Sequence, residues 1–336
     1  MNKVCVLGAG SWGSALAMVL ASNNNDVFIW TRRQEQADEI NNEHTNESYL
    51  PKIKLSGKIK ATCDIKKAVV DSELIVLALP SQKIRFLCKE IKDIVNEKQI
   101  LINVAKGIEY DTGKRISQIC EEELPNNPYC MLSGPSHAEE VSVNMPTALV
   151  SASKDIVISR IVQDYFMNEY LRVYTNTDLI GVELGGATKN IIAFGAGILD
   201  GMGYGDNSKA ALITRGINEI CRFGKEMGAD VSTFLGLTGV GDLVVTCTSM
   251  HSRNRRAGIL IGKGKSLEET KKEIKMVVEG ITATEAVYNM AQDLNIDMPI
   301  TNAIYKTIHM GLDPNESIKE LMGRAKKHEN ENKLVL

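Results

Sequence analysis

The feature that most constrains this chain is a glycine-rich segment directly behind a short apolar run. Gly8-Ala9-Gly10-Ser11-Trp12-Gly13 follows the strand-like residues 4–7 and opens a helix-like segment at about residues 11–22. In such a unit the first glycine allows a tight turn, the second lets a pyrophosphate approach the backbone, and the third lets helix and strand pack closely. The amides at the helix N-terminus then face the anion. The pattern therefore predicts a dinucleotide site at Gly8, Gly10 and Gly13, the alternative being a structural turn without a ligand.

Apolar runs and amphipathic stretches alternate through the first half of the chain. Residues 27–30, 74–79 and 100–104 are β-rich, and residues 82–95 place Ile84, Leu87, Ile91 and Ile94 at helical spacing. Continuous apolar strands separated by helices indicate a parallel sheet covered on both faces. Residues 129–133, 147–151 and 172–174 are predicted as later strands.

The pattern changes after about residue 180, where strand-like runs end and helical patterns take over. These patterns cover residues 191–196, 210–227, 283–294 and 300–310. A chain of 336 residues suits two domains. We predict an α/β Rossmann-type N-terminal domain, residues 1–180, that binds the dinucleotide, and an all-α C-terminal domain, residues 181–336, for substrate binding and catalysis. The polar tail, residues 324–333, is expected to fray.

Charge and cysteine usage exclude several classes of protein. The chain has 39 Lys+Arg against 42 Asp+Glu, so it lacks the excess of positive charge that nucleic-acid binding favours. The longest strongly apolar run, residues 74–79, is far shorter than the ~20 residues that cross a bilayer. The seven scattered cysteines form no Cys-x-x-Cys pair, and the five histidines show no metal-ligand spacing. We expect a cytoplasmic enzyme with reduced thiols, without metal, nucleic-acid or membrane partners.

The end of the second predicted strand bears on which dinucleotide is bound. NAD-preferring sites place an acidic residue about 20 residues past the glycines, at the ribose 2′-hydroxyl. Here Thr31 is followed by Arg32 and Arg33. Two guanidiniums attract a 2′-phosphate that a carboxylate would repel. We predict a preference for NADP(H), with NAD(H) as the alternative.

Two later segments are unusually polar and glycine-rich for their surroundings. Residues 183–190 end in Lys189-Asn190 ahead of the apolar residues 191–196, which predicts Lys189 at a helix start. That is a poor place for a solvated lysine, because the positive end of the helix dipole disfavours cations. Residues 239–243 precede the basic cluster 253–256, which is either a solvated face or a set of donors for a phosphate.

The order of several such blocks resembles the bacterial NAD(P)-dependent glycerol-3-phosphate dehydrogenase family, from Gly8 to about Met310. The blocks are GAGSWGSALA (8–17), NVAKGIE (103–109), SGPS (133–136), ELGGATKN (183–190), DGMGYGDNSKAALITR (200–215), GVGDLVVT (239–246), SRNRRAG (252–258) and the Glu279-Gly280 pair.

The resemblance implies reversible hydride transfer between NAD(P)H and dihydroxyacetone phosphate, giving sn-glycerol 3-phosphate for glycerophospholipid synthesis, in a homodimer. It implies Lys189 as the acid/base, with Lys106 and Asp242 as the other catalytic residues. Because the reduced ketone needs a proton, a general acid within hydrogen-bond reach is required. The implied substrate-binding residues are Lys106, Gly134, Ser136, Lys189, Asn190, Asp242, Thr246, Ser252, Arg253 and Asn254. Besides the three glycines, the implied cofactor-binding residues are Ser11, Trp12, Arg32, Arg33, Lys106, Ala138, Arg253, Val277 and Glu279.

Two alternatives stay open from the sequence. The 6-phosphogluconate and 3-hydroxyisobutyrate dehydrogenases are similar in plan and also use a lysine followed by asparagine. The other alternative is a non-catalytic NADPH sensor. Such a protein would be expected to lack Lys189, Asp242 and Arg253, which are present here.

Overall fold

The structure is a computed structural model that describes the chain except residues 1, 327 and 330–336. By compactness the chain divides into two units. The first comprises Met1–Lys106 and Lys114–Leu179, and the second comprises Gly107–Gly113 and Ile180–Leu336. The segment Gly107–Gly113, inside the predicted first domain, thus belongs to the second unit. Of the polar tail 324–333, residues 327 and 330–333 lie outside the described residues.

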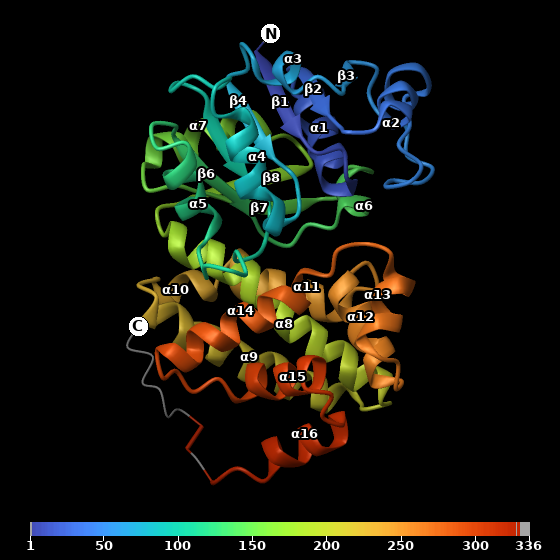
Figure 1. The fold of residues 1–336 in the computed structure, drawn as a ribbon. Helices are drawn as coiled ribbons and strands as arrows, with labels where there is room; N and C mark the ends of the chain where they lie inside the picture. The colour runs from blue at the N-terminus through green and yellow to red at the C-terminus, as the bar shows by residue number, and fades with distance from the viewer. Residues whose placement is uncertain (1, 327, 330–336) are drawn as a thin grey trace. The chain divides into compact units, whose positions relative to one another are not determined.

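The first unit is built on an eight-stranded sheet (Figure 1). Its strand order is β3-β2-β1-β4-β5-β6-β7-β8, and all neighbours are parallel except β6 and β7. The predicted α/β Rossmann-type fold is confirmed. The strands are β1 (Lys3–Leu7), β2 (Asp26–Trp30), β3 (Ile59–Thr62), β4 (Leu74–Leu77), β5 (Ile100–Asn103), β6 (Tyr129–Ser133), β7 (Thr147–Ala152) and β8 (Leu171–Asn176).

Helices cover both faces of this sheet. Val4 and Val6 of β1 belong to one buried cluster, while Cys5 and Leu7 belong to another on the opposite face. Strand side chains alternate between faces, so a strand with two apolar partners reads as a continuous apolar run. The helical segments are α1 (Ser11–Ser22), α2 (Gln34–Asp38), η1 (Glu39–Glu43), α3 (Ile65–Val69), η2 (Ser81–Lys83), α4 (Ile84–Ile91), α5 (Ile116–Glu123), α6 (Ala138–Val141) and α7 (Ile156–Phe166).

The strand β3 escaped the sequence prediction. It lies at the sheet edge with β2 as its neighbour, and Ile59 is the buried residue among its four. An edge strand with one buried position lacks the apolar run that marked the others.

The second unit is helical, as predicted (Figure 1). Its longest helix, α8, has 23 residues and absorbs the predicted residues 191–196. The segments are α8 (Leu179–Gly201), α9 (Asp206–Glu226), α10 (Val231–Phe234), η3 (Leu237–Gly241), α11 (Asp242–Thr248), α12 (Arg253–Gly262), α13 (Leu267–Ile274), α14 (Glu279–Asp293), α15 (Pro299–His309) and α16 (Pro314–Met322).

Helices α8 and α12 touch through their backbones. A Cβ added at Gly197 of α8 would lie 2.0 Å from the carbonyl oxygen of Arg255, and one at Gly258 of α12 would lie 2.1 Å from that of Phe194. Gly201 and Gly262 repeat the arrangement one turn further on. A Cβ added at either glycine would lie 2.3 Å from a carbonyl oxygen of the facing helix. Since neither helix has room for a side chain along this line, their relative position is tightly constrained.

One stretch of the second unit, Val231–Thr248, is long and apolar enough to cross a membrane by length and composition alone. In the structure this stretch is divided among α10, η3 and α11 rather than forming one helix. It also carries Asp242, whose carboxylate is ion-paired.

Candidate active site

The glycine turn of the first unit leaves room for a phosphate group. Gly8 has a φ of +127°, and a Cβ there would lie 2.5 Å from the carbonyl oxygen of Ala78. A Cβ at Gly13 would lie 2.0 Å from the carbonyl oxygen of Gly8, so these two glycines are required by packing. Nothing lies within 4 Å of a Cβ built at Gly10. The open backbone at Gly10 fits the close approach of a dinucleotide pyrophosphate.

The first turn of α1 is suited to an anion. Gly10 is its N-cap and makes no side-chain capping bond, and the first turn contains no acidic residue. Backbone N–H groups at such a helix start carry the positive end of the dipole. Ser11 and Trp12, predicted as cofactor contacts, are half-buried here, and the Ser11 hydroxyl donates to the carbonyl oxygen of Tyr49 at 2.7 Å.

A buried polar network behind the turn was missed by the sequence analysis. The Gln36 amide donates to the carbonyl oxygen of Ala9 at 2.7 Å, and the Asn46 amide donates to the same oxygen at 3.0 Å. Gln36 also accepts from Thr31, and Asn46 bonds the Ser14 hydroxyl. These bonds hold the turn from behind. No local pattern distinguishes Gln36 and Asn46 from surface residues, because their partners lie far along the chain.

Arg32 and Arg33 are exposed beyond the end of β2. The Arg33 guanidinium lies 5.4 Å from the centre of the Tyr49 ring. Within the part of the chain that the structure describes, neither guanidinium forms an ion pair with a carboxylate. Both charges are therefore available to a phosphate.

The first unit also brings together three residues predicted to contact substrate. The Lys106 ammonium donates to the carbonyl oxygen of Gly134 at 2.7 Å, and the Ser136 hydroxyl donates to the same oxygen at 3.0 Å. Gly134 has a φ of +137°, which favours glycine in the turn after β6. Ala138, a predicted cofactor contact, is the buried first residue of α6.

Lys189 lies in the middle of α8, and its predicted place at a helix start is wrong. Gly185, within the glycine-rich residues 183–190, serves helix packing. A Cβ at Gly185 would lie 2.5 Å from the carbonyl oxygen of Thr238, so α8 contacts η3 there. The dipole argument therefore does not apply to this lysine, and its surroundings have a different explanation.

The Lys189 ammonium is buried and held by two partners on α11. It donates to the Asp242 carboxylate, and to the Thr246 hydroxyl at 2.7 Å. Lys189 is 6% exposed and Asp242 is 1% exposed. The Thr246 hydroxyl in turn donates to the carbonyl oxygen of Asp242. Because burial disfavours an isolated charge, the adjacent carboxylate is what stabilises the protonated ammonium here.

A second contact joins the predicted phosphate-binding residues to the same helix. The Asn254 amide donates to Asn190 Oδ1 at 2.8 Å, and Asn254 Oδ1 accepts from the backbone N–H of Gly280 at 2.8 Å. Ser252 caps α12, and Arg253 beside it is exposed. The second unit thus gathers the predicted proton donor, Lys189, and the predicted phosphate-binding residues around α8. Of the predicted cofactor contacts there, Val277 is exposed just before α14, and Glu279 opens that helix.

All seven cysteines are free thiols, the nearest recorded approach of two being 3.9 Å between the sulfurs of Cys88 and Cys120. Among the described residues no group of three or more His, Cys, Asp or Glu side chains could hold a metal ion.

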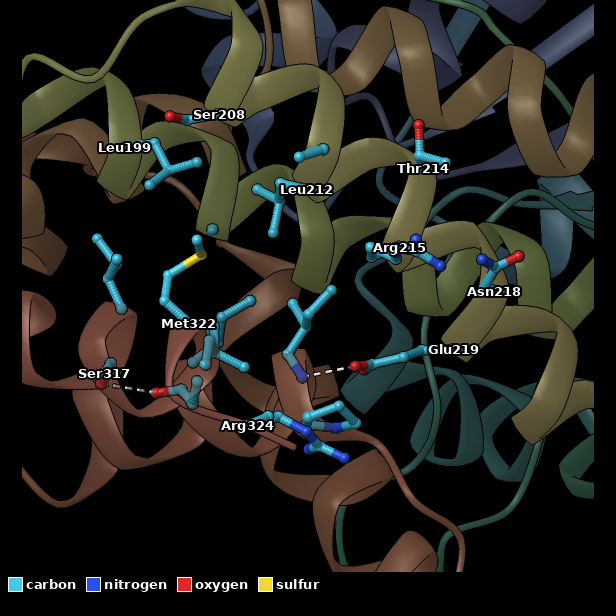
Figure 2. A pocket seen from close by; sticks show the side chains of 18 of the residues that line it. Leu199, Ser208, Leu212, Thr214, Arg215, Asn218, Glu219, Ser317, Met322 and Arg324 are labelled. Atoms are coloured by element: carbon cyan, nitrogen blue, oxygen red, sulfur yellow. Dashed lines mark hydrogen bonds between the residues drawn. The ribbon is translucent and has the colours of Figure 1, made fainter. Parts of the chain in front are cut away.

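A large open cavity lies elsewhere in the second unit, among α8, α9, α15 and α16 (Figure 2). Its volume is about 1160 Å³, and none of the predicted site residues lines it. Glu219 of α9, labelled in Figure 2, lies beside it. Its carboxylate accepts from the backbone N–H groups of Ile300 and Thr301 at the start of α15. This buried carboxylate satisfies two amides that the helix itself leaves unpaired.

Burial raises the pKa of Glu219 to about 7, despite these hydrogen bonds and the nearby Arg222. In the unfolded chain the carboxyl has its ordinary pKa, so between about pH 4.5 and 7 the folded state binds the extra proton. The contribution of Glu219 to the free energy of unfolding therefore falls as pH rises through that window, by on the order of 3 kcal/mol in all.

We expect Glu219→Gln to remove this pH dependence. The difference in unfolding free energy between the native protein and the variant, measured by urea denaturation, should decrease from pH 4.5 to 7 and then level off. Asp230→Asn is the matched control. Hydrogen bonds from Ser232 lower the pKa of Asp230, so its stabilising contribution is lost as pH falls. A difference that rises with pH for Glu219 would contradict the prediction.

Comparison with known proteins places these features in one family. Residues 3–158 match the family described as NAD-dependent glycerol-3-phosphate dehydrogenase N-terminus, and residues 178–319 match its C-terminus. The chain is 53% identical to a glycerol-3-phosphate dehydrogenase [NAD(P)+] of Staphylococcus epidermidis, over 98% of this chain and 100% of the relative. It is 52% identical to one of Bacillus cereus, over 98% of each chain.

A solved structure is similar over the same length. The glycerol-3-phosphate dehydrogenase of Coxiella burnetii superposes with a TM-score of 0.92 at 37% identity, covering 96% of this chain and 99% of that one.

Proposed function

Because the chain belongs to the glycerol-3-phosphate dehydrogenase [NAD(P)+] family, we propose that it catalyses the reversible NAD(P)H-dependent reduction of dihydroxyacetone phosphate to sn-glycerol 3-phosphate. The chain is an NAD(P)-dependent oxidoreductase. The observation that carries the proposed chemistry is the buried pairing of Lys189 with Asp242. An ammonium positioned in this way can give a proton to the substrate oxygen in ketone reduction and take it back in the reverse reaction.

The proposed chemistry assigns each residue a role. A bound nicotinamide cofactor supplies the hydride. Lys189 donates the proton that the substrate oxygen requires after reduction, while Asp242 and Thr246 orient the ammonium. Lys106 contacts substrate and cofactor beside the carbonyl oxygen of Gly134.

The substrate phosphate is proposed to bind at the start of α12. Arg253 supplies charged hydrogen-bond donors and Asn254 supplies amide hydrogen-bond donors. Ser252 is the N-cap of α12, where the helix N-terminus favours an anion. Asn190 supports Asn254 through the bond between their side chains. Gly134 and Ser136 complete the proposed contacts to substrate.

The test of the function is oxidation of NADPH by purified protein, with and without dihydroxyacetone phosphate. We expect oxidation that depends on this ketone, and little with the oxidised substrates of 6-phosphogluconate or 3-hydroxyisobutyrate dehydrogenases. Turnover of those compounds instead would favour the alternative dehydrogenase class. NADPH binding without any turnover would favour the sensor.

We also propose that NADPH is preferred over NADH, because exposed Arg32 and Arg33 follow β2 where an acidic residue would mark an NAD site. Arg32→Asp should raise the KM for NADPH relative to NADH by about 10-fold or more, since a charge-assisted contact contributes roughly 1.5–3 kcal/mol. Steady-state kinetics with both cofactors measure the ratio.

The matched control for this variant is Arg160→Asp, which makes the same change at an exposed position of α7. It should leave the ratio of the two KM values unchanged. A native protein with a lower KM for NADH, together with no effect of Arg32→Asp on the ratio, would show that the preference is wrong.

The cellular setting is proposed from the same resemblance. The product is the glycerol backbone of phospholipids, so the enzyme would supply glycerophospholipid synthesis. The seven free cysteines suit a reducing compartment, and we propose a cytoplasmic homodimer. Light scattering of the purified protein measures the oligomeric state.

A further inference from the structure

The carboxylate of Asp200, at the end of α8, binds two cations from two other helices. Its Oδ1 lies 2.6 Å from Nζ of Lys209 on α9, and its Oδ2 lies 2.7 Å from Nε of Arg255 on α12. The three side chains are 13–16% exposed. Ion pairs so shielded from solvent are strongly coupled, unlike pairs on an open surface.

Arg255 carries this connection to a third element. Its NH1 donates to the carbonyl oxygen of Thr248 at 2.6 Å, at the last residue of α11. A cation is favourable at a helix C-terminus. Helix α11 contains Asp242 and Thr246, the two partners of the Lys189 ammonium. The Arg255 guanidinium therefore connects α11 to α12, the helix that begins at Arg253.

The residues around the start of α12 are also fixed on their other side. Asn254 bonds both Asn190 and the backbone of Gly280, and α12 touches α8 at Gly258. The turn between α11 and α12, residues 249–252, ends at the buried Ser252, whose hydroxyl accepts from the backbone N–H of Arg255. The bond from Arg255 to Thr248 spans this turn.

We propose that Asp200 is a positioning residue for substrate phosphate binding, acting through Arg255. The carboxylate orients the guanidinium, which holds the turn and so aims Ser252 and Arg253 at the phosphate. The Asp200 carboxylate pairs with Lys209 and Arg255, whereas Lys189 pairs with Asp242, so we expect loss of the Asp200 charge to affect substrate binding more than proton transfer. The inference rests on the function proposed above.

The experiment measures KM for dihydroxyacetone phosphate and kcat with saturating NADPH in Asp200→Asn. We expect KM to rise by about 10-fold or more, since a small misplacement of binding groups is costly. The kcat should stay within about 3-fold, because only binding interactions are lost. Arg253→Ala, which removes a proposed phosphate contact itself, should show a KM increase at least as large.

A double-mutant cycle separates positioning through Arg255 from a general structural role. In an Arg255→Gln background, Asp200→Asn should change KM little further, because the ion pair between Asp200 and Arg255 is already absent. Arg255→Lys is the second variant. It keeps the charge beside Asp200 but lacks the planar fork that also reaches Thr248, so its KM should rise as well. Glu320→Gln, which removes the exposed Lys306–Glu320 pair, is the control and should leave KM unchanged.

Three results would overturn the proposal in an active enzyme: an unchanged KM in Asp200→Asn, a fall in kcat alone, or equal effects of Asp200→Asn in both backgrounds. If Asp200→Asn fails to fold, an unchanged KM in Arg255→Lys overturns it. A native protein that does not oxidise NADPH with dihydroxyacetone phosphate would overturn the proposed function and this inference together.

Discussion

Replacing Lys189 by alanine is expected to lower kcat by about 10²–10⁴-fold, the usual contribution of a general acid, with NADPH affinity nearly intact. The physical reason is that the substrate oxygen would lose its proton donor. Steady-state kinetics and cofactor titration measure the two effects. Retained turnover would assign the acid elsewhere, with Lys106 the next candidate.

The structure adds a control that the sequence could not suggest. Removing Lys189 leaves the Asp242 carboxylate buried without its partner, which costs about 3–5 kcal/mol of stability. The double variant Lys189→Met/Asp242→Asn replaces the pair with neutral side chains of similar size, so we expect it to recover much of that stability. It should remain inactive. Activity recovered together with stability would show that Lys189 is structural.

Replacing Gly258 by alanine should cause the largest loss of stability among the simple glycine substitutions in α12. The new Cβ would lie 2.1 Å from the carbonyl oxygen of Phe194 and 2.9 Å from Cα of Gly197, both backbone atoms of α8. Backbone cannot rotate away as a side chain can, so the helices must separate. We expect a loss of about 3 kcal/mol or more in the free energy of unfolding, measured by urea denaturation.

Gly205→Ala is the matched control. Gly205 precedes α9 in the same unit, has a negative φ, and has nothing within 4 Å of its added Cβ. We expect a change below about 1 kcal/mol, the scale of a poorer N-cap. Equal losses in the two variants would mean that the close contact of α8 and α12 does not limit stability.

Local patterns predicted the elements that are buried on both sides. The apolar runs at residues 4–7, 27–30 and 100–104 became β1, β2 and β5 with bounds that differ by one residue, because strands in a covered parallel sheet are apolar on both faces. The helix at residues 11–22 was also predicted correctly. The pattern failed at β3, where one buried residue leaves no run to detect.

Glycine in the sequence indicates either a turn or a close contact between helices, because both need a position without a side chain. Before α1 the glycines form a turn, and at Gly185, Gly197 and Gly258 they let helices touch. A sequence shows only the missing side chain in both cases. The prediction of a helix start at Lys189 followed from the apolar residues 191–196 after it, whereas α8 begins at Leu179 and runs through the glycines.

The sequence by itself determined the fold class, the glycine turn and the residues that mark the family. These are matters of period, spacing and residue type, and they can be recognised without knowing what packs against what. Tertiary structure decided that Lys189 is buried against Asp242, 53 residues away, that Gln36 and Asn46 hold the turn at Ala9, and that Asp200 joins α8 to α9 and α12. Such pairings depend on burial, which withdraws a polar group from water and makes its partner necessary, and burial is a property of the packed chain.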